Sequence, residues 1–295
     1  MARITERGTR ARTAVAATAI AVAATVWGVS TLVGPGHTPA HGIAGDHDPA
    51  RPDGSGSGPG GKPAKGIPEG ITHASESGAN AVNITIDDGP DPRWTPQVLD
   101  VLAEHGVKAT FCMIGPQAEA HPDLVKRVAA AGHRLCDHTM NHDTAMDRKP
   151  VAYQEQQILD AKKLIEAAAG GAKVEYYRAP GGAFTPDSRR IAAAHGMRPL
   201  GWNVDTKDFG KPGAAAIVDA VKREIGNGPT VLFHDGGGNR AQTVEALDGV
   251  LGWLKQQGRP TGFPVRTAPD AADSADATAA HGAEESDGGA VGTVS

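Results

Sequence analysis

The chain has 295 residues, among them 39 glycines and 21 prolines, and its 29 basic and 34 acidic side chains give a net charge of -5. This balance excludes a generally basic nucleic-acid binder, because such a protein attracts phosphates with an excess of cationic side chains. Two cysteines are too few for a disulfide-stabilised miniprotein, and no Gly-X-Y period indicates collagen. The length suits one large domain or two small ones.

The N-terminal segment has the layout of an export signal. Arginines in residues 1–12 precede an uncharged stretch rich in Ala and Val, from Ala14 to Val33. A basic stretch followed by an apolar one is typical of a secretory signal, and a length of about 20 residues also suits a membrane span. We therefore predict that residues 1–33 form a signal peptide or an N-terminal membrane anchor. The protein would then be secreted, or membrane-anchored on the extracellular side.

Two other segments have the composition of disordered chain. Residues 34–78 are rich in Gly and Pro and lack apolar periodicity, so they cannot bury enough apolar surface to offset their ordering entropy. Residues 267–295 combine acidic side chains with Ala, Gly and Ser and contain no Lys or Arg. We expect a disordered linker at 34–78, a disordered acidic tail at 267–295, and a single domain at 79–266 between them.

Strand-like and helix-like segments alternate through residues 79–266. The expected strands are 81–86, 108–113, 133–137, 174–177, 199–204, 230–234 and 261–265. The expected helices are 95–105, 122–131, 150–169, 185–195, 213–225 and 241–257. Thr-Pro pairs at Thr95 and Thr185 predict that each threonine is a helix N-cap. Strands separated by helices predict right-handed βαβ units in a parallel sheet, either a barrel or a doubly wound open sheet. In both, active sites lie at the C-terminal ends of the strands.

Chemically active side chains follow most of the expected strands. Asp87 and Asp88 follow the first strand, and two such carboxylates are tolerated where a cation or an arginine compensates their repulsion. An Asp-Gly-Pro turn is the simpler explanation of this pair. His138 and His142, four residues apart, could bind one cation from a single helical turn, although two surface histidines are also common. His234 follows a buried apolar strand, where it is a candidate general acid if a metal and a base face it.

Five motifs in order make the chain resemble polysaccharide deacetylases of the NodB-homology type, carbohydrate esterase family 4. The motifs are Thr85-Ile86-Asp87-Asp88-Gly89, His138-Thr139-Met140-Asn141-His142, Arg178-Ala179-Pro180-Gly181-Gly182, Asp208-Phe209 and Leu232-Phe233-His234-Asp235. The resemblance covers about residues 80–265. It implies an α/β fold, a distorted (β/α)7-type barrel, with a single catalytic domain between disordered flanks.

The resemblance also implies a metal and a base. Asp88, His138 and His142 would bind a divalent cation, zinc in most such enzymes, with cobalt as the alternative. Asp87 would be the general base that activates water, and Arg178 would pair with it.

The remaining motif residues would complete the reaction. His234 would be the general acid that protonates the leaving group, oriented by Asp208. The backbone N–H of Gly181 would contact the developing oxyanion. Leu232 would line the pocket for the acetyl methyl group, and Phe209 would form an apolar wall.

Three residues depart from the family pattern and affect the substrate more than the chemistry. Ile86 replaces a usual Phe, Phe209 replaces a usual Trp, and Gly181 stands where many members have an aromatic residue. A side-chain contact to sugar is therefore lost at Gly181, while its backbone donor is kept.

The resemblance implies a metal-dependent hydrolase acting on non-peptide carbon–nitrogen bonds. It would remove acetyl groups from an extracellular glycan, with N-acetylglucosamine residues of peptidoglycan or a chitin-like polymer as the first expectation. An O-acetyl esterase acting on acetyl-xylan is the alternative within the class. A non-catalytic cell-wall glycan-binding protein is the alternative outside it, and such a protein is expected to lack the base, a metal ligand or the acid. We expect a monomer with a polysaccharide substrate and no nucleic-acid partner.

The two cysteines leave two interpretations open. Cys112 and Cys136 lie late in the second and third expected strands. Export permits a disulfide between them, although bridging adjacent parallel strands is geometrically awkward. Two small buried apolar side chains are the alternative.

Overall fold

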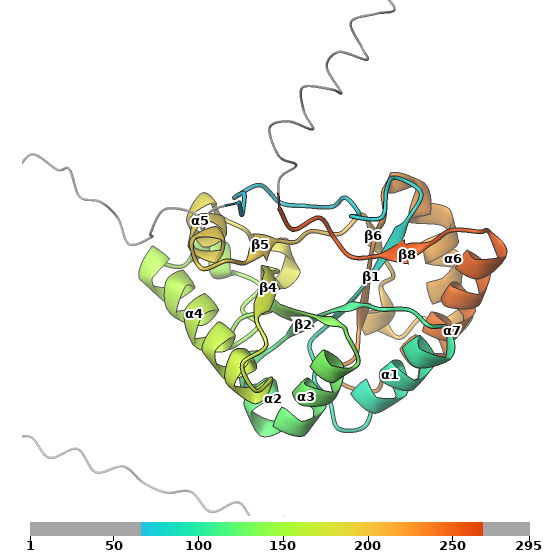
Figure 1. Cartoon of the computed structure of the whole chain (residues 1–295), viewed down its shortest axis with the longest axis horizontal. Coiled ribbons are helices and arrows are strands. Elements are labelled where there is room, and N and C mark those ends of the chain that lie inside the picture. The colour runs from blue at the N-terminus through green and yellow to red at the C-terminus, as the bar shows by residue number, and fades with distance from the viewer. Residues whose placement is uncertain (1–65, 268–295) are drawn as a thin grey trace, which may run out of the picture. The chain divides into compact units, whose positions relative to one another are not determined.

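The computed structural model describes residues 66–267, which form an α/β fold around a parallel sheet (Figure 1). Its strands are β1 (Val82–Asp87), β2 (Thr110–Met113), β3 (Arg134–Asp137), β4 (Val174–Tyr177), β5 (Arg198–Pro199), β6 (Val204–Asp205), β7 (Thr230–His234) and β8 (Thr261–Gly262). Its helices are α1 (Thr95–Glu104), α2 (Gly115–Ala120), α3 (Pro122–Ala130), α4 (Val151–Ala168), α5 (Pro186–Ala194), α6 (Ala214–Glu224) and α7 (Ala241–Gln256).

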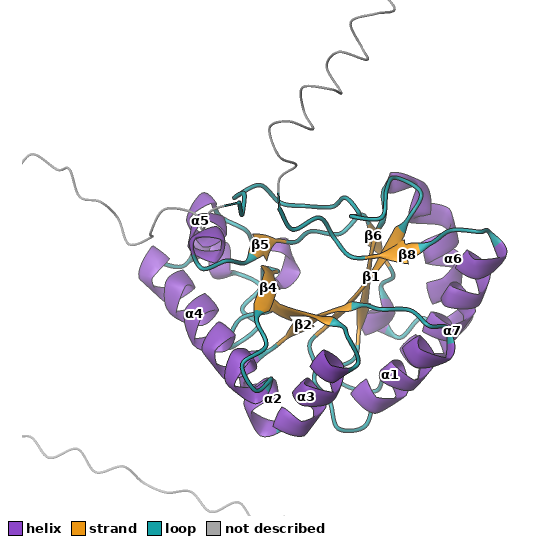
Figure 2. Ribbon diagram, in the orientation of Figure 1, coloured by secondary structure: helices purple, strands orange, loops and turns teal. Residues whose placement is uncertain are grey.

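The strand order identifies the sheet as an interrupted barrel. The strands are ordered β5-β4-β3-β2-β1-β7-β6, and β8 also pairs with β1. Followed around a ring, this order is the chain order of seven strands with the ladder between β5 and β6 missing. A doubly wound sheet would instead reverse its strand order near the middle. The helices lie outside the strands (Figure 2), so the predicted distorted barrel is confirmed.

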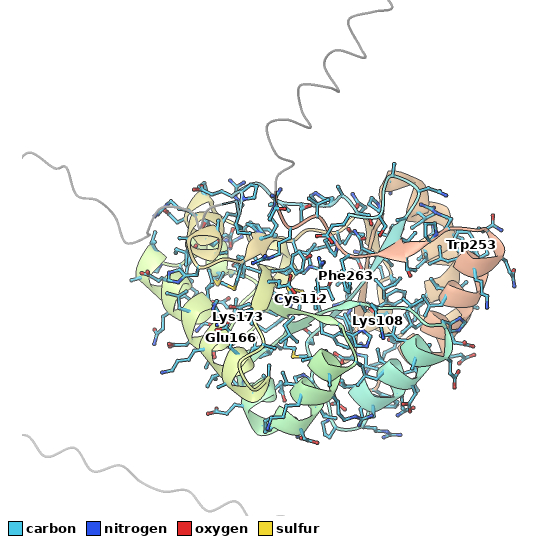
Figure 3. All side chains as sticks on the ribbon, in the orientation of Figure 1. Lys108, Cys112, Glu166, Lys173, Trp253 and Phe263 are labelled. Carbon is cyan, nitrogen blue, oxygen red and sulfur yellow. A yellow bond between two sulfur atoms is a disulfide. The ribbon has the colours of Figure 1, made fainter. Side chains whose placement is uncertain are left out.

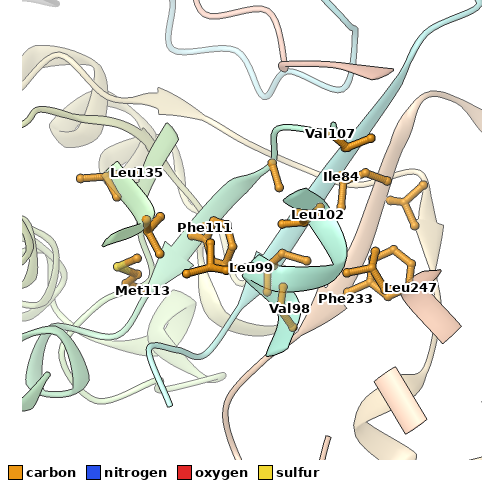
Figure 4. Close-up of a cluster of buried hydrophobic side chains, with 14 of the residues drawn as sticks. Ile84, Val98, Leu99, Leu102, Val107, Phe111, Met113, Leu135, Phe233 and Leu247 are labelled. Atoms are coloured by element: carbon orange, nitrogen blue, oxygen red, sulfur yellow. The ribbon is translucent and has the colours of Figure 1, made fainter. Parts of the chain in front are cut away.

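A continuous apolar core joins the helices to the strands. All six residues of β1 are buried, and α1 turns Val98, Leu99 and Leu102 toward the same interior (Figure 4). Burying one such side chain contributes about 1.5–3 kcal/mol. This packing fixes β1 in place, and β1 ends at Asp87.

One expected strand and one expected cap are wrong. The segment predicted as a strand at 199–204 contains two short strands, β5 and β6, separated by residues 200–203. The middle of this segment is held instead by the chain that precedes β1, since Gly201 N donates to Thr72 O. The N-cap of α1 is Trp94 rather than Thr95, because the Thr95 hydroxyl donates to Asp235 Oδ2 over 2.6 Å. Helix α2 was not expected from the sequence.

The domain begins earlier than residue 79. Ile67 and Thr72, which belong to the expected linker, are 5% and 4% exposed. Thr72 forms a parallel bridge with Leu200, and Ser75 forms an antiparallel bridge with Pro264. These are backbone contacts, and the Gly/Pro-rich composition of the segment gives no sign of them. Residues 66–78 are therefore part of the domain.

The other predicted flanks lie outside the described residues. These are the signal peptide or anchor at 1–33, the linker up to residue 65 and the tail from residue 268. Among residues 66–267, no helix combines the length and the apolar character needed to cross a bilayer.

Cys112 and Cys136 form a disulfide. They lie directly opposite each other in the β2–β3 ladder, with their Cα atoms 4.1 Å apart. Both are fully buried, in a small cluster with Tyr176 and Leu200, and Cys112 lies among the central strands in Figure 3. The register of two neighbouring strands, which the sequence does not reveal, brings the sulfur atoms together.

Candidate active site

The C-terminal ends of the strands bring the predicted site residues to one cavity of about 510 Å³. Asp87 ends β1 and is paired in register with His234, which ends β7. Arg178 and Asp208 are buried and do not line the cavity. The predicted residues that line it are Asp87, Asp88, His138, His142, Gly181, Phe209, Leu232 and His234.

Asp87 and Arg178 form a buried ion pair. Arg178 Nη1 donates to Asp87 Oδ1 over 2.7 Å, and the two side chains are 0% and 3% exposed. Arg178 Nη1 also donates to Thr85 Oγ1, while Nε and Nη2 donate to the backbone carbonyls of Leu200 and Gly201. Burial raises the pKa of Asp87, and the charge of Arg178 opposes this rise. A carboxylate that is ionised but more basic than usual suits a general base.

Asp88, His138 and His142 form a candidate metal centre. One ligand atom from each of the three side chains lies within 4.8 Å of the others. Asp88 Oδ1 is 3.2 Å from His142 Nε2 and 3.7 Å from His138 Nε2. This oxygen is buried and has no hydrogen-bond partner among the described residues, which is costly unless a cation or proton compensates it.

His138 has the protonation state that a metal ligand needs. Its Nδ1 contacts the carbonyl oxygen of Arg178 at 2.8 Å, so Nδ1 carries the proton and Nε2 faces Asp88. Burial lowers the pKa of His138 to about 3, although the charge of Asp88 opposes this effect. A neutral imidazole whose other nitrogen donates to a carbonyl is the usual form of a metal-bound histidine. Two imidazoles and one carboxylate therefore fit a catalytic zinc site.

The two histidines meet through a loop and not through a helical turn. The segment that joins them is not helical, and Thr139 and His142 have positive φ angles of 70° and 51°. Their ring centroids lie 4.9 Å apart. The proximity of the two rings was thus predicted for the wrong local structure.

His234 and Asp208 form a second buried pair. His234 Nδ1 lies 2.6 Å from Asp208 Oδ1, and His234 N donates to Asp208 Oδ2 over 2.9 Å. Thr243, in the first turn of α7, donates its hydroxyl to the same Oδ2 over 2.8 Å. Burial alone would lower the pKa of His234, but the hydrogen bond and charge of Asp208 outweigh it and raise this pKa. A protonated imidazole held this way can act as a general acid.

Gly181 presents its backbone to the cavity in a left-handed conformation. Its φ is 60° and its ψ is 13°, which glycine adopts without steric cost. A Cβ atom at this position would lie 3.2 Å from Thr144 Cβ. The short turn that contains Gly181 follows β4, and Gly181 itself lines the cavity.

Five residues of the cavity wall were not among the predicted site residues: Thr144, Ala179, Trp202, Asp205 and Lys207. Ala179 lies within the motif Arg178-Ala179-Pro180-Gly181-Gly182, whereas no sequence motif marks the other four residues. Thr243 was also missed, because it lies on a helix far along the chain from Asp208. Only the three-dimensional structure shows that α7 brings the Thr243 hydroxyl to Asp208.

Comparison with known proteins agrees with this geometry. The model of the polysaccharide deacetylase family matches residues 74–200. A chitooligosaccharide deacetylase of Sinorhizobium fredii is 40% identical over 207 residues, which cover 66% of this chain and 93% of that protein. A peptidoglycan-N-acetylglucosamine deacetylase of Bacillus cereus is 39% identical over 190 residues, covering 64% of this chain and 88% of that protein.

A solved structure supports the same relationship. The family 4 carbohydrate esterase from Streptomyces lividans, in complex with acetate, superposes with a TM-score of 0.58. It is 31% identical in sequence, and the match covers 65% of this chain and 100% of that one.

Proposed function

The chain belongs to the polysaccharide deacetylase family, whose members are hydrolases, and from this premise we propose that it removes acetyl groups from N-acetylglucosamine residues of an extracellular glycan. The observation that carries the proposal is the gathering of three units at one cavity. These units are the Asp87–Arg178 pair, the cluster of Asp88 with two histidines, and the His234–Asp208 pair. A glycan-binding protein without catalysis has no need of all three.

The cation is proposed to be held by Asp88, His138 and His142, with zinc as the first expectation. The chemistry that it supplies when bound is polarisation of a carbonyl and a lowered pKa for water. The buried Asp88 oxygen that lacks a hydrogen-bond partner and the two histidine Nε2 atoms that face it support this assignment.

Asp87 is proposed to take a proton from the water molecule whose oxygen forms the new bond to the acetyl carbonyl carbon. Its Oδ2 lies 3.4 Å from His138 Nε2, so the base and the proposed ligands share one end of the cavity. Arg178 holds the other oxygen of Asp87 and fixes the orientation of the carboxylate. Because Arg178 is held by four acceptors, it has little freedom to release Asp87.

His234 is proposed to give a proton to the nitrogen of the leaving amine, which breaks the carbon–nitrogen bond and releases acetate. Asp208 orients the imidazole, and its hydrogen bond and charge raise the pKa of His234, which favours the charged form. The N–H of Gly181 would stabilise the negative charge that develops on the acetyl oxygen. Leu232, which lines the cavity and is 5% exposed, would contact the acetyl methyl group.

The proposed location is outside the cell. The basic and apolar N-terminal sequence supports export, either with a cleaved signal or with a retained anchor. The buried Cys112–Cys136 disulfide supports it independently, because such bonds persist in oxidising compartments.

The proposal is tested by measuring acetate release from three substrates: N-acetylglucosamine oligomers, peptidoglycan and acetyl-xylan. We expect release from at least one of the first two. Release from acetyl-xylan alone would show that the protein is an O-acetyl esterase and not an N-deacetylase. Release from none of the three substrates would contradict the proposed function.

Two variants identify the catalytic site in the same assay. Asp87→Asn keeps the size of the side chain but removes the base, so we expect acetate release to fall by at least about 100-fold, within the usual contribution of general-base catalysis. Asp100→Asn makes the same chemical change at an exposed position of α1 and serves as the matched control. Equal activity of the two variants would show that Asp87 is not the base.

A further inference from the structure

A buried carboxylate beside the active site has no part in the proposed reaction. Asp235 directly follows β7, is 0% exposed and does not line the catalytic cavity. Its Oδ2 accepts a hydrogen bond from the Thr95 hydroxyl over 2.6 Å, and its Oδ1 has no hydrogen-bond partner among residues 66–267. A buried carboxylate that is only partly hydrogen-bonded is costly, so its place in the fold calls for a reason.

The turn next to Asp235 holds Asp88 in an unfavourable backbone conformation. The φ angle of Asp88 is 78°, in the left-handed region that residues other than glycine rarely adopt. In this conformation Asp88 Oδ1 lies 3.7 Å from His138 Nε2 and 3.2 Å from His142 Nε2. Such a conformation persists only where the surrounding contacts hold it. The geometry of the candidate metal centre therefore depends on what holds this turn.

Backbone hydrogen bonds hold the beginning of the turn. Asp88 N donates to Cys112 O over 3.1 Å, and Asp235 N donates to Asp87 O over 3.0 Å. These bonds continue the pairing of β1 with its neighbours β2 and β7. They are made by main-chain atoms, so they do not depend on the identity of a side chain.

Side chains hold the end of the turn. Asp91 N donates to Thr95 Oγ1 over 2.8 Å, and the Thr95 hydroxyl donates its own proton to Asp235 Oδ2. One buried hydroxyl thus joins the end of the turn to the carboxylate beside it. Since Asp235 directly follows a strand that is paired with β1, the relay from Asp91 through Thr95 ties the turn to the sheet.

The carboxylate of Asp235 also lies directly against the turn. A Cβ atom on Gly89 would overlap Asp235 Oδ1, and a Cβ atom on Gly236 would overlap the carbonyl oxygen of Asp88. Glycine at both positions allows the turn and the segment after β7 to approach this closely. The turn fills the space on this side of Oδ1, so Asp235 is suited to supporting the turn rather than to binding a cation.

We propose that Asp235 and Thr95 are positioning residues for the candidate metal centre. They hold the turn at 88–91 so that Asp88 faces the two histidines of the cluster. Neither residue would touch the cation or the substrate, because both act through Asp88. Residues that support metal ligands in this way typically contribute roughly 10- to 100-fold to metal affinity. The proposal rests on the cation site of the proposed function.

The test measures the Zn²⁺ affinity of chelator-treated full-chain protein, by competition with a chromophoric chelator and without substrate. Thr95→Val removes the hydroxyl at nearly constant size, so the Zn²⁺ dissociation constant is expected to rise at least about tenfold. Asp235→Ala is expected to raise it by at least as much. Thr95→Ser keeps the hydroxyl and is expected to restore the affinity of the unsubstituted protein.

Thr243→Val is the matched control. Thr243 also lies in the first turn of a helix, α7, and donates its hydroxyl to a buried carboxylate. That carboxylate, Asp208, contacts His234, which is not one of the proposed metal ligands. The control is expected to bind Zn²⁺ as tightly as the unsubstituted protein. Unchanged affinity in Thr95→Val, or an equal loss in Thr95→Val and Thr243→Val, would contradict the proposal.

Unfolding of each metal-free variant in denaturant separates positioning from folding. A lower midpoint with unchanged Zn²⁺ affinity would assign Thr95 and Asp235 to folding alone and overturn the proposal. Either variant suffices for the affinity measurement if the other does not fold.

The affinity measurement also separates this proposal from the proposed function, because it involves no turnover. Weaker Zn²⁺ binding in Thr95→Val and Asp235→Ala would support the positioning role even if the unsubstituted protein released no acetate. Acetate release by the unsubstituted protein together with full Zn²⁺ affinity in both variants would refute the positioning role and leave the proposed function standing. Absence of Zn²⁺ binding by the unsubstituted protein would contradict both.

Discussion

Removing the Cys112–Cys136 disulfide is expected to destabilise the domain without removing any other contact. The bond closes a loop with a sequence separation of 24 residues. In the loop-entropy model, a loop of this size constrains the unfolded chain by about 3.5 kcal/mol. For a domain of this length, the same free energy corresponds to a fall in Tm of about 7 to 14 °C.

The assay compares unfolding curves in guanidinium chloride with and without reductant. Both cysteines are fully buried, so the bond is reduced after unfolding and the midpoints are compared at equilibrium. Reductant is expected to lower the midpoint of the unsubstituted protein. A Cys112→Ala/Cys136→Ala double variant is the matched control, because its midpoint cannot respond to the reductant through this bond. An unchanged midpoint of the unsubstituted protein would show that the disulfide does not stabilise the domain.

Three further outcomes are expected. Thr243→Val removes a hydroxyl from the buried carboxylate of Asp208, so kcat should fall about tenfold with little change in KM, and Thr243→Ser should restore it. Arg178→Met leaves Asp87 without its buried partner and should destabilise the fold by about 3–5 kcal/mol in denaturant titrations. Burial lowers the pKa of His133 to about 4 in the folded protein, whereas the unfolded chain binds this proton with a pKa near 6.5. The free energy of unfolding should therefore fall by about 2 kcal/mol between pH 7 and pH 5. His133→Asn should remove this loss.

Each of these three predictions has an outcome that would contradict it. A Thr243→Val variant whose KM rises with no change in kcat would place the hydroxyl in substrate binding instead. Unchanged stability of Arg178→Met would mean that the ion pair has no net structural role. An identical pH dependence of the unsubstituted protein and His133→Asn would assign the acid sensitivity to other groups.

Local sequence signals predicted the regular elements well where one signal acted alone. The Thr185-Pro186 start of α5 is an example, since Thr185 accepts a hydrogen bond from Ser188 N as an N-cap should. The same signal failed at Thr95, because its hydroxyl donates a hydrogen bond to Asp235, which lies 140 residues away in the sequence. A threonine's local preference cannot reveal such a distant partner.

The candidate site was predictable because it depends on ordered motifs at strand ends. The sequence did not predict the tertiary contacts that other residues make with these motifs. The contact of Thr243 with Asp208 depends on how α7 packs, and Trp202 reaches the cavity wall from residues 200–203, which lie between β5 and β6. The first residues of the domain were missed for a similar reason, because backbone bridges such as Thr72 to Leu200 leave no compositional trace.

The central claim is that a divalent cation held by Asp88, His138 and His142 supports acetate release at this cavity. This claim is tested by measuring acetate release from an N-acetylglucosamine tetramer. The full-chain protein is first treated with a chelator, and release is measured before and after Zn²⁺ is added. We expect no acetate release before Zn²⁺ is added, recovery of release after it is added, and no recovery in His138→Ala. Full activity of the chelated, metal-free protein, or recovery in His138→Ala equal to that of the unsubstituted protein, would contradict it.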